Sequence, residues 1–149
     1  YVVVSDGRSH LATAERFVEA DVVRVLPERL DVRAGDAAVV MTHSFEQDTQ
    51  IISFLLDRPQ WPVYVGVLGP QRRTRELLEA VAQQLDLVPS EHLIENWLLK
   101  LHAPTGLDLG AETPATIALS IVAEVQKVLA HGTALPLRQV RAMKAATQV

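Results

Sequence analysis

Apolar residues in the first half of the chain gather in short runs that polar and charged stretches separate. Four runs have the length and the β-branched composition of strands, at residues 1–5, 22–26, 37–42 and 63–67. The first run, Tyr1–Ser5, is apolar until its last residue, which is the pattern of a strand buried on both faces. The chain therefore begins with the elements of a β-sheet.

Helical periodicity fills most of the segments between and after these runs. Ser44 and Gln47 have the spacing of a capping box at the start of a helix that ends by Arg58, before Pro59. Thr113 has the character of an N-cap, with Pro114 at the first helical position. The predicted helices are residues 13–18, 44–58, 70–85, 90–101 and 114–131.

Strands that alternate with helices predict an α/β fold with a mainly parallel, doubly wound sheet flanked by helices. Right-handed crossovers would bring the carboxyl ends of the strands to one edge, where open sheets of this kind bind ligands. Asp6, Thr42, His43 and the segment Gly69–Arg73 follow these strand ends. We expect them to lie at the same edge.

Two of these residues have an ordinary interpretation as well as a functional one. An acid at the end of a parallel strand is where dinucleotide-binding folds bind a ribose hydroxyl, but Asp6 before Gly7 is also a common turn. His43 lies at a strand-to-helix junction, yet a single histidine there is often a surface or capping residue. No second histidine or acid at metal-ligand spacing supports a zinc site.

Three arginines fall within the first two turns of the helix predicted over residues 70–85, at the positive end of its dipole. The pairs Arg72–Glu76 and Arg75–Glu79 have the weaker order of charges for an i,i+4 ion pair. A bound phosphate would neutralise these cations through bidentate guanidinium contacts. The alternative is a solvated basic face.

A glycine-punctuated loop precedes the last long helix. Gly106 and Gly110 allow a tight fold around Asp108, and the loop leads to a helix N-terminus, which favours anions. The alternative is a plain connector in which Asp108 caps its own turn. After this helix, residues 133–149 carry three basic residues and no acid, so we expect a domain at 1–132 and a basic tail at 133–149 that forms an amphipathic helix or contacts a partner.

Composition narrows the function classes. The 149 residues fit one domain, and a net charge of −4 predicts no bulk attraction to nucleic acid. There is no cysteine, so disulfides, thiolate nucleophiles and cysteine–zinc sites are excluded within this chain. The sequence shows no signal peptide and no apolar run long enough to span a membrane, so we expect a soluble cytoplasmic domain.

Several of these segments together resemble a known family. The order and approximate spacing of the motifs resemble the carboxyl-terminal domain of the XdhC/CoxI family, the xanthine dehydrogenase accessory proteins. The segments that carry this resemblance are VVVSDGR at 2–8, ATAERFVEAD at 12–21, THSFEQD at 42–48, YVGVLGPQRRTREL at 64–77 and LHAPTGLDLGAETPATIALSIVAEV at 101–125.

The resemblance implies a Rossmann-like domain and a role in cofactor maturation. Proteins of this family bind the molybdenum cofactor, promote its sulfuration with a cysteine desulfurase, and transfer it to molybdenum hydroxylases such as xanthine, aldehyde or carbon monoxide dehydrogenase. The resemblance also implies a set of cofactor-binding positions. By matching position these are Asp6, Thr42, His43, Gly66, Gly69, Arg72, Arg73, Gly106, Asp108 and Gly110, with His102 and Pro104 in the same final loop.

The sequence departs from the family pattern at its start. The first strand of the family domain, its glycine-rich turn and the separate amino-terminal domain have no counterpart here, so the chain has the features of a fragment. Two other functions stay open, which are an NAD(P)-binding oxidoreductase and a docking module for the dehydrogenase. No nucleophile–base pair is evident, which favours a chaperone over an enzyme. We also expect a homo-oligomer.

Overall fold

The computed structural model describes residues 1–26 and 30–146, with side chains up to Arg141 in the last helix. Contacts divide the chain into two compact units, Tyr1–Pro104 and Thr105–Val149. The predicted boundary between a domain at 1–132 and a tail at 133–149 lies inside the second unit and stays a prediction.

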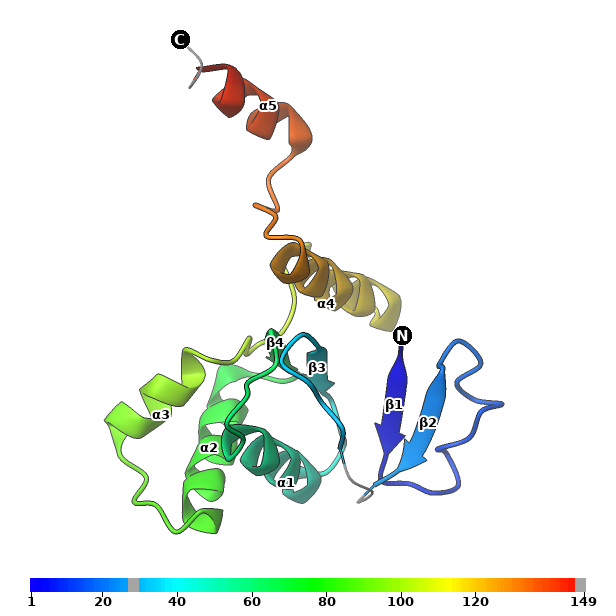
Figure 1. Ribbon diagram of the computed structural model, residues 1–149, viewed down its shortest axis with the longest axis vertical. Helices are drawn as coiled ribbons and strands as arrows, with labels where there is room; N and C mark the ends of the chain where they lie inside the picture. The colour runs from blue at the N-terminus through cyan, green and yellow to red at the C-terminus, as the bar shows by residue number, and fades with distance from the viewer. Residues whose placement is uncertain (27–29, 147–149) are drawn as a thin grey trace. The chain divides into compact units, whose positions relative to one another are not determined.

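The four predicted strands are present, and their pairing is parallel. Strand β1 (Val3–Asp6) pairs with β2 (Val22–Val25), and β3 (Ala37–Val40) pairs with β4 (Tyr64–Val67). In the described residues these strands form two separate two-stranded sheets rather than one continuous sheet (Figure 1). The α/β class and the parallel pairing are therefore confirmed, although the sheet is divided.

A short segment extends the β3–β4 sheet on its far side. The His102 N–H donates to the Val65 carbonyl at 2.9 Å, and the Val67 N–H donates to the His102 carbonyl at 2.9 Å. The His102 ring also stacks on Tyr64, with ring centroids 4.3 Å apart. The predicted helix over 90–101 consequently ends earlier, as α3 (Glu91–Leu98), because the chain must straighten to pair with β4.

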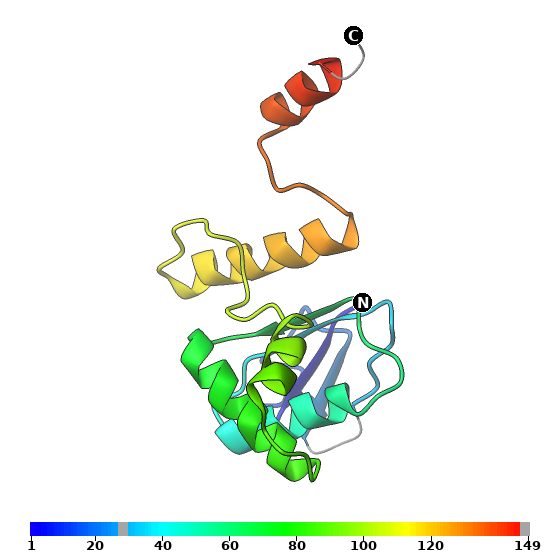
Figure 2. The same cartoon turned by 90° about the vertical axis from the view of Figure 1, so that its left-hand side faces the viewer.

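Two helices cover one face of the β3–β4 sheet. Helix α1 (Phe45–Leu56) and helix α2 (Gln71–Gln84) lie side by side against it, and α3 packs outside α2 (Figures 1 and 2). The spacing of the apolar positions predicted this face, because residues three and four apart share one side of a helix. The fully buried residues of this cluster are Ile52, Leu55, Val65, Val67, Leu77, Leu78, Val81 and Ala82.

Two predictions for the first 26 residues are wrong. The segment 13–18 forms a turn and not a helix, in which the N–H groups of Arg16 and Phe17 both donate to the Thr13 carbonyl. Six residues are too few to stabilise a helix without packing. The first strand is also not buried on both faces, since Tyr1, Val2 and Val3 are 92%, 53% and 43% exposed.

The second unit contains the long helix α4 (Pro114–Leu129) and α5 (Leu137–Ala146). Thr113 caps α4 as predicted, and Thr116 completes a capping box with it. The helix ends two residues earlier than predicted, because His131 adopts a left-handed conformation with φ 51° and the Gly132 N–H donates to the Lys127 carbonyl.

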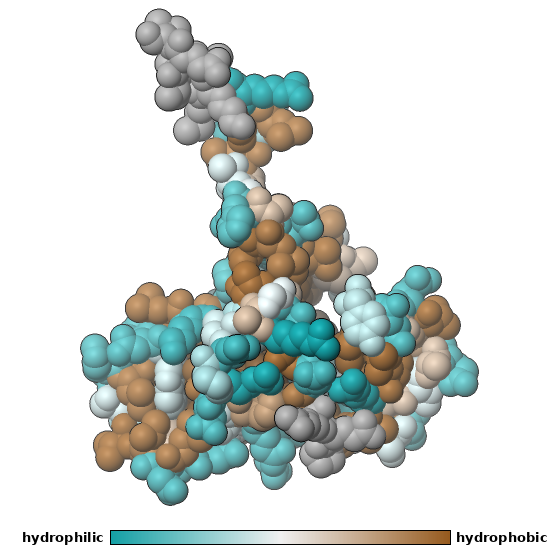
Figure 3. Space-filling model, viewed as in Figure 1, coloured by the Kyte–Doolittle hydropathy of each residue, from teal (hydrophilic) through white to brown (hydrophobic). Residues whose placement is uncertain are grey.

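Helix α5 agrees with the helix predicted in the tail. Helix α4 carries apolar side chains on its surface. Figure 3 shows apolar side chains gathered over α4, where Leu119, Val122 and Leu129 are exposed. Throughout residues 1–26 and 30–146, the helices are too short or too polar to cross a membrane.

Candidate functional site

A buried carboxylate joins the ends of three elements of the first unit. Asp48, in the first turns of α1, is 1% exposed. Its Oδ1 accepts hydrogen bonds from the Thr42 N–H at 3.2 Å and the Thr42 hydroxyl at 2.6 Å, and its Oδ2 accepts one from Arg73 at 2.6 Å. The carboxyl end of β3, the start of α1 and the start of α2 therefore meet at Asp48.

The loop between β4 and α2 leads to Arg73, which contacts this carboxylate. Gly69 has φ 120°, a conformation that glycine adopts without strain, and the Leu68 N–H donates to the Val40 carbonyl at 2.9 Å. Pro70 is the N-cap of α2 and not its first helical residue, since its ψ of 150° is extended. Within the described part of the chain, no side chain caps this helix start.

The three arginines have different partners. Arg73 binds Asp48, and Arg75 binds Glu91 at 3.0 Å and Glu95, both in α3. The predicted Arg75–Glu79 pair is wrong, because α3 brings two carboxylates closer than the next turn of α2 does. Arg72 does face Glu76 as predicted, but at 3.7 Å and with its side chain 88% exposed. Arg72 is thus the arginine whose guanidinium is accessible to a ligand.

The end of β1 lies at the start of α1. A Cβ at Gly7 would lie 1.9 Å from Nε2 of Gln47, so the Gln47 side chain covers this glycine. Only half of the predicted Ser44–Gln47 capping box forms. The Ser44 hydroxyl accepts from the Gln47 N–H, but the Ser44 N–H donates to the Thr42 hydroxyl and not to the Gln47 side chain. The structure therefore brings together the ends of β1, β3 and β4, as the parallel topology predicted.

Asp6 is held by a neighbour in sequence. Its carboxylate accepts from the Arg8 N–H at 2.9 Å, from Arg8 Nε at 3.0 Å and from a terminal guanidinium nitrogen at 2.8 Å. The side-chain hydrogen bonds from Arg8, and then the backbone one, lower the pKa of Asp6 to about 2. Both oxygens are engaged, which leaves less capacity to bind a ribose hydroxyl.

Two further predicted residues of this edge differ in accessibility. His43 follows Thr42 directly and is exposed. Gly66 is buried in β4, between Val39 of β3 and the backbone of His102. Throughout the described ranges there is no group of three or more His, Cys, Asp or Glu residues that could hold a metal ion.

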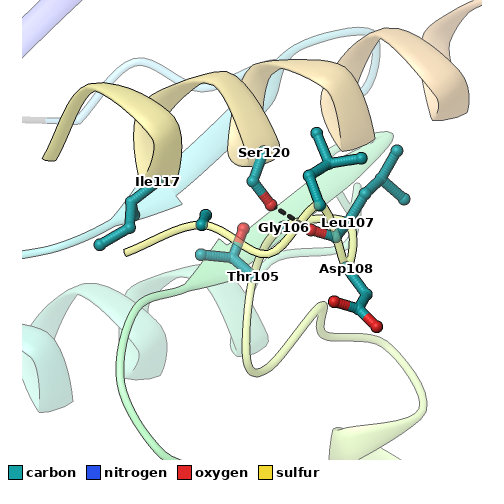
Figure 4. A pocket seen from close by; sticks show the side chains of 8 residues that line it. Thr105, Gly106, Leu107, Asp108, Ile117 and Ser120 are labelled. Atoms are coloured by element: carbon teal, nitrogen blue, oxygen red, sulfur yellow. Dashed lines mark hydrogen bonds between the residues drawn. The ribbon is translucent and has the colours of Figure 1, made fainter. Parts of the chain in front are cut away.

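The predicted final-loop residues Gly106, Asp108 and Gly110 belong to the second unit, where the loop lies along the side of α4. The Gly106 N–H donates to Glu124 at 2.7 Å, and Ser120 donates to the Leu107 carbonyl (Figure 4). Gly106 has φ 111°, and a Cβ there would lie 2.6 Å from the Ser120 hydroxyl.

Thr113 and Thr116 cap the start of α4, and Glu124, on a later turn, accepts the Gly106 N–H, so the anion site expected at this helix start stays a prediction. The loop and the helix border an open hollow of about 300 Å³, lined by residues that include Thr105, Gly106 and Ile117. Asp108 also lines it and is exposed, with its carboxylate directed away from α4 in Figure 4.

Sequence reasoning missed Asp48, which is the centre of the network in the first unit. Two signals pointed to it. Asp48 follows Thr42 by six residues in the first turns of a helix, and Arg73 has Leu77 rather than an acid four residues later. Arg73 has no acid four residues later, and the junction between β3 and α1 contains the acid Asp48. Together these two features predict an ion pair between residues distant in sequence.

Comparison with known proteins agrees with this geometry. A family model described as the XdhC Rossmann domain matches residues 1–125. This chain belongs to that family. Its fold is accordingly that of a Rossmann domain, with parallel strands and flanking helices.

Individual relatives lead to the same family. The chain is 35% identical over 129 residues to a probable xanthine dehydrogenase subunit of Bacillus subtilis, a match that covers 83% of this chain and 34% of that protein. It is 32% identical over 101 residues to the uncharacterized protein YqeB of Escherichia coli, covering 68% of this chain and 17% of that protein.

A solved structure is similar as well. The crystal structure of a xanthine dehydrogenase from Bacillus halodurans matches with a TM-score of 0.68 and 32% sequence identity, covering 88% of this chain and 36% of that one. This chain therefore spans about a third of the length of the two Bacillus relatives.

Proposed function

We propose that this chain is the cofactor-binding part of a xanthine dehydrogenase accessory protein. In this role it binds the molybdenum cofactor, assists its sulfuration and hands it to a molybdenum hydroxylase. Membership of the XdhC family and the names of the two Bacillus relatives, which both refer to xanthine dehydrogenase, support this proposal.

The observation that carries the proposal is the start of α2. This helix begins with Arg72 88% exposed, with no acid in its first turn and, in the described residues, with no side-chain cap. Its first N–H groups and the positive end of its dipole are available to an anion, and Arg72 supplies a guanidinium beside them. These groups fit the phosphate of a pterin cofactor.

A cysteine desulfurase is the sulfur donor in the proposed role. Cofactor sulfuration needs such a donor, and this chain has no cysteine. In the proposal the desulfurase supplies the sulfur, while this chain holds the cofactor. A homo-oligomer and a molybdenum hydroxylase as the recipient complete the proposed set of partners.

The NAD(P)-dependent oxidoreductase has less support from the geometry, because Arg8 engages both oxygens of its main residue, Asp6. The docking role is favoured by one observation, the exposed apolar side chains of Leu119, Val122 and Leu129 on α4. Docking and cofactor binding are compatible, since the residues concerned belong to different units.

A matched pair of variants tests the cofactor proposal. Arg72→Ala in the full-length protein should weaken binding of the molybdenum cofactor at least about tenfold, because a charge-assisted contact to phosphate contributes about 1.5–3 kcal/mol. Arg33→Ala is the control, since Arg33 is also exposed and faces an acid at 3.9 Å. Equilibrium dialysis with molybdenum analysis measures both. Equal affinity of Arg72→Ala and the parent would refute the proposal.

A further inference from the structure

Phe45 is a large aromatic residue in an unusual position. It is the first residue of α1, directly after the His43–Ser44 junction, and it is 43% exposed. An aromatic ring gains stability from burial, so this exposed ring contributes less to folding than a core residue does. It lies instead at the edge where the carboxyl ends of β3 and β4 meet.

The ring is held in place by the buried network. The Arg73 guanidinium lies 6.0 Å from the centroid of the Phe45 ring, within the range of a cation–π contact. Arg73 is itself fixed by Asp48 at 2.6 Å, and Asp48 is fixed by Thr42. Because the ring is positioned before any ligand arrives, binding to it costs little side-chain entropy.

Exposed apolar side chains also follow the ends of β3 and β4, at the same edge. Leu68 and Met41 are 39% and 51% exposed and follow the ends of β4 and β3, which the Leu68–Val40 hydrogen bond joins. Gly69 comes next, and a Cβ there would lie 3.4 Å from Arg73 Cδ. The nearest acid in sequence, Glu46, accepts a hydrogen bond from Gln50 along α1.

We infer that Phe45 stacks on the planar ring of a phosphorylated heteroaromatic ligand whose phosphate contacts Arg72. This inference rests on the proposed function and adds the ring-binding residue of the same site. An aromatic face flanked by a guanidinium stacks on heteroaromatic rings of any hydrogen-bonding pattern. Pterin phosphates and purine nucleotides share this chemistry, a planar ring and a phosphate in one molecule.

Four probes separate the ring from the phosphate. They are neopterin phosphate, AMP, unphosphorylated neopterin and ribose 5-phosphate, titrated by calorimetry against the full-length protein. Phe45→Ala should weaken neopterin phosphate or AMP, whichever the parent binds, about tenfold and leave ribose 5-phosphate unchanged. Phe45→Trp should restore binding to within about threefold, because indole stacks at least as well as phenyl.

The control is Phe17→Ala, which removes another ring beside a guanidinium, that of Arg16 at 5.8 Å. It should leave all affinities unchanged. If Phe45→Ala lowers the affinity for ribose 5-phosphate as much as for the ring-bearing phosphates, or lowers no affinity, the stacking role is overturned. Binding that still depends on Arg72 would in that case continue to support the proposed function. Ring binding that needs Phe45 but not Arg72 would keep the stacking role and remove the phosphate site. A parent protein that binds none of the four probes would overturn both.

Discussion

The two parallel strand pairs of the first unit are equally short, yet their environments differ. Helices α1 and α2 cover β3–β4, and all four residues of β4 are buried. The pair β1–β2 contains no fully buried residue, and Val3 is exposed. Similar apolar runs are thus buried to different extents, because burial depends on the helices that pack on a strand and not on the strand alone.

The polar groups of the two pairs differ in the same way. Asp48, beside β3–β4, is buried and needs three hydrogen bonds to be tolerated there. Asp6, at the end of β1, forms an ion pair with Arg8, whose side chain is 45% exposed, so water screens the interaction. An aspartate therefore contributes much to the free energy of unfolding beside β3–β4 and little at the end of β1.

The largest expected effect comes from breaking the buried pair. Arg73→Ala leaves the Asp48 carboxylate buried with hydrogen bonds from Thr42 alone, so the free energy of unfolding should fall by about 3 kcal/mol. Arg72→Ala is the control one residue away and should change it by less than about 0.5 kcal/mol, because Arg72 is exposed. Urea denaturation measures both, and equal effects of the two variants would contradict the structural role of Arg73.

A buried hydroxyl on α2 gives an effect of the opposite sign. Among the residues that the structure describes, Thr74 Oγ1 is buried without a hydrogen-bond partner. Thr74→Val should raise the free energy of unfolding by about 1 kcal/mol, because the unsatisfied polar atom is removed at nearly constant volume. The matched control, Thr49→Val, should lower it by about 1 kcal/mol, since the buried Thr49 hydroxyl donates to the Phe45 carbonyl. A thermal melt in which both variants shift in the same direction would show this explanation to be wrong.

The smallest effect is expected at the exposed strand pair, and it depends on pH. The folded pKa of Asp6 is lowered to about 2, so its interaction with Arg8 stabilises the fold above about pH 4 and is lost as the pH falls through 2. Asp6→Asn should therefore lower the free energy of unfolding by about 0.5 kcal/mol at pH 7 and by almost nothing near pH 2. Denaturation curves at the two pH values test this, with Asp31→Asn as a control whose pair with Arg33 is exposed. A constant difference between Asp6→Asn and the parent would contradict it.

Features that depend on neighbours in sequence were predictable. The caps at Ser44 and Thr113 lie where the sequence placed them, because a cap bonds to residues two or three positions away. The buried faces of α1 and α2 followed from helical periodicity in the same way. The meeting of Thr42 with Arg73 was predictable too, since right-handed crossovers bring parallel strand ends to one edge.

Features that depend on distant pairs were missed. Arg73 and Asp48 are 25 residues apart, and Arg75 and Glu91 are 16 apart. Nothing in the local pattern distinguishes Glu91 from Glu79 as the partner of Arg75. The loop at Gly106 was interpreted from its glycines as an anion site, although Ser120 and Glu124, on later turns of α4, decide where its backbone goes.

The sequence by itself determined the α/β class, the parallel strands, the starts of α1 and α4, and the family. These properties follow from short-range patterns of polarity and from motifs that a single segment carries. Only the tertiary structure decided which arginine stays accessible, which carboxylate is buried, and that Phe45 stands at the edge of the site. The physical reason is that the energy of a charge or an aromatic ring depends on solvent exclusion and on partners, and both are set by segments distant in sequence.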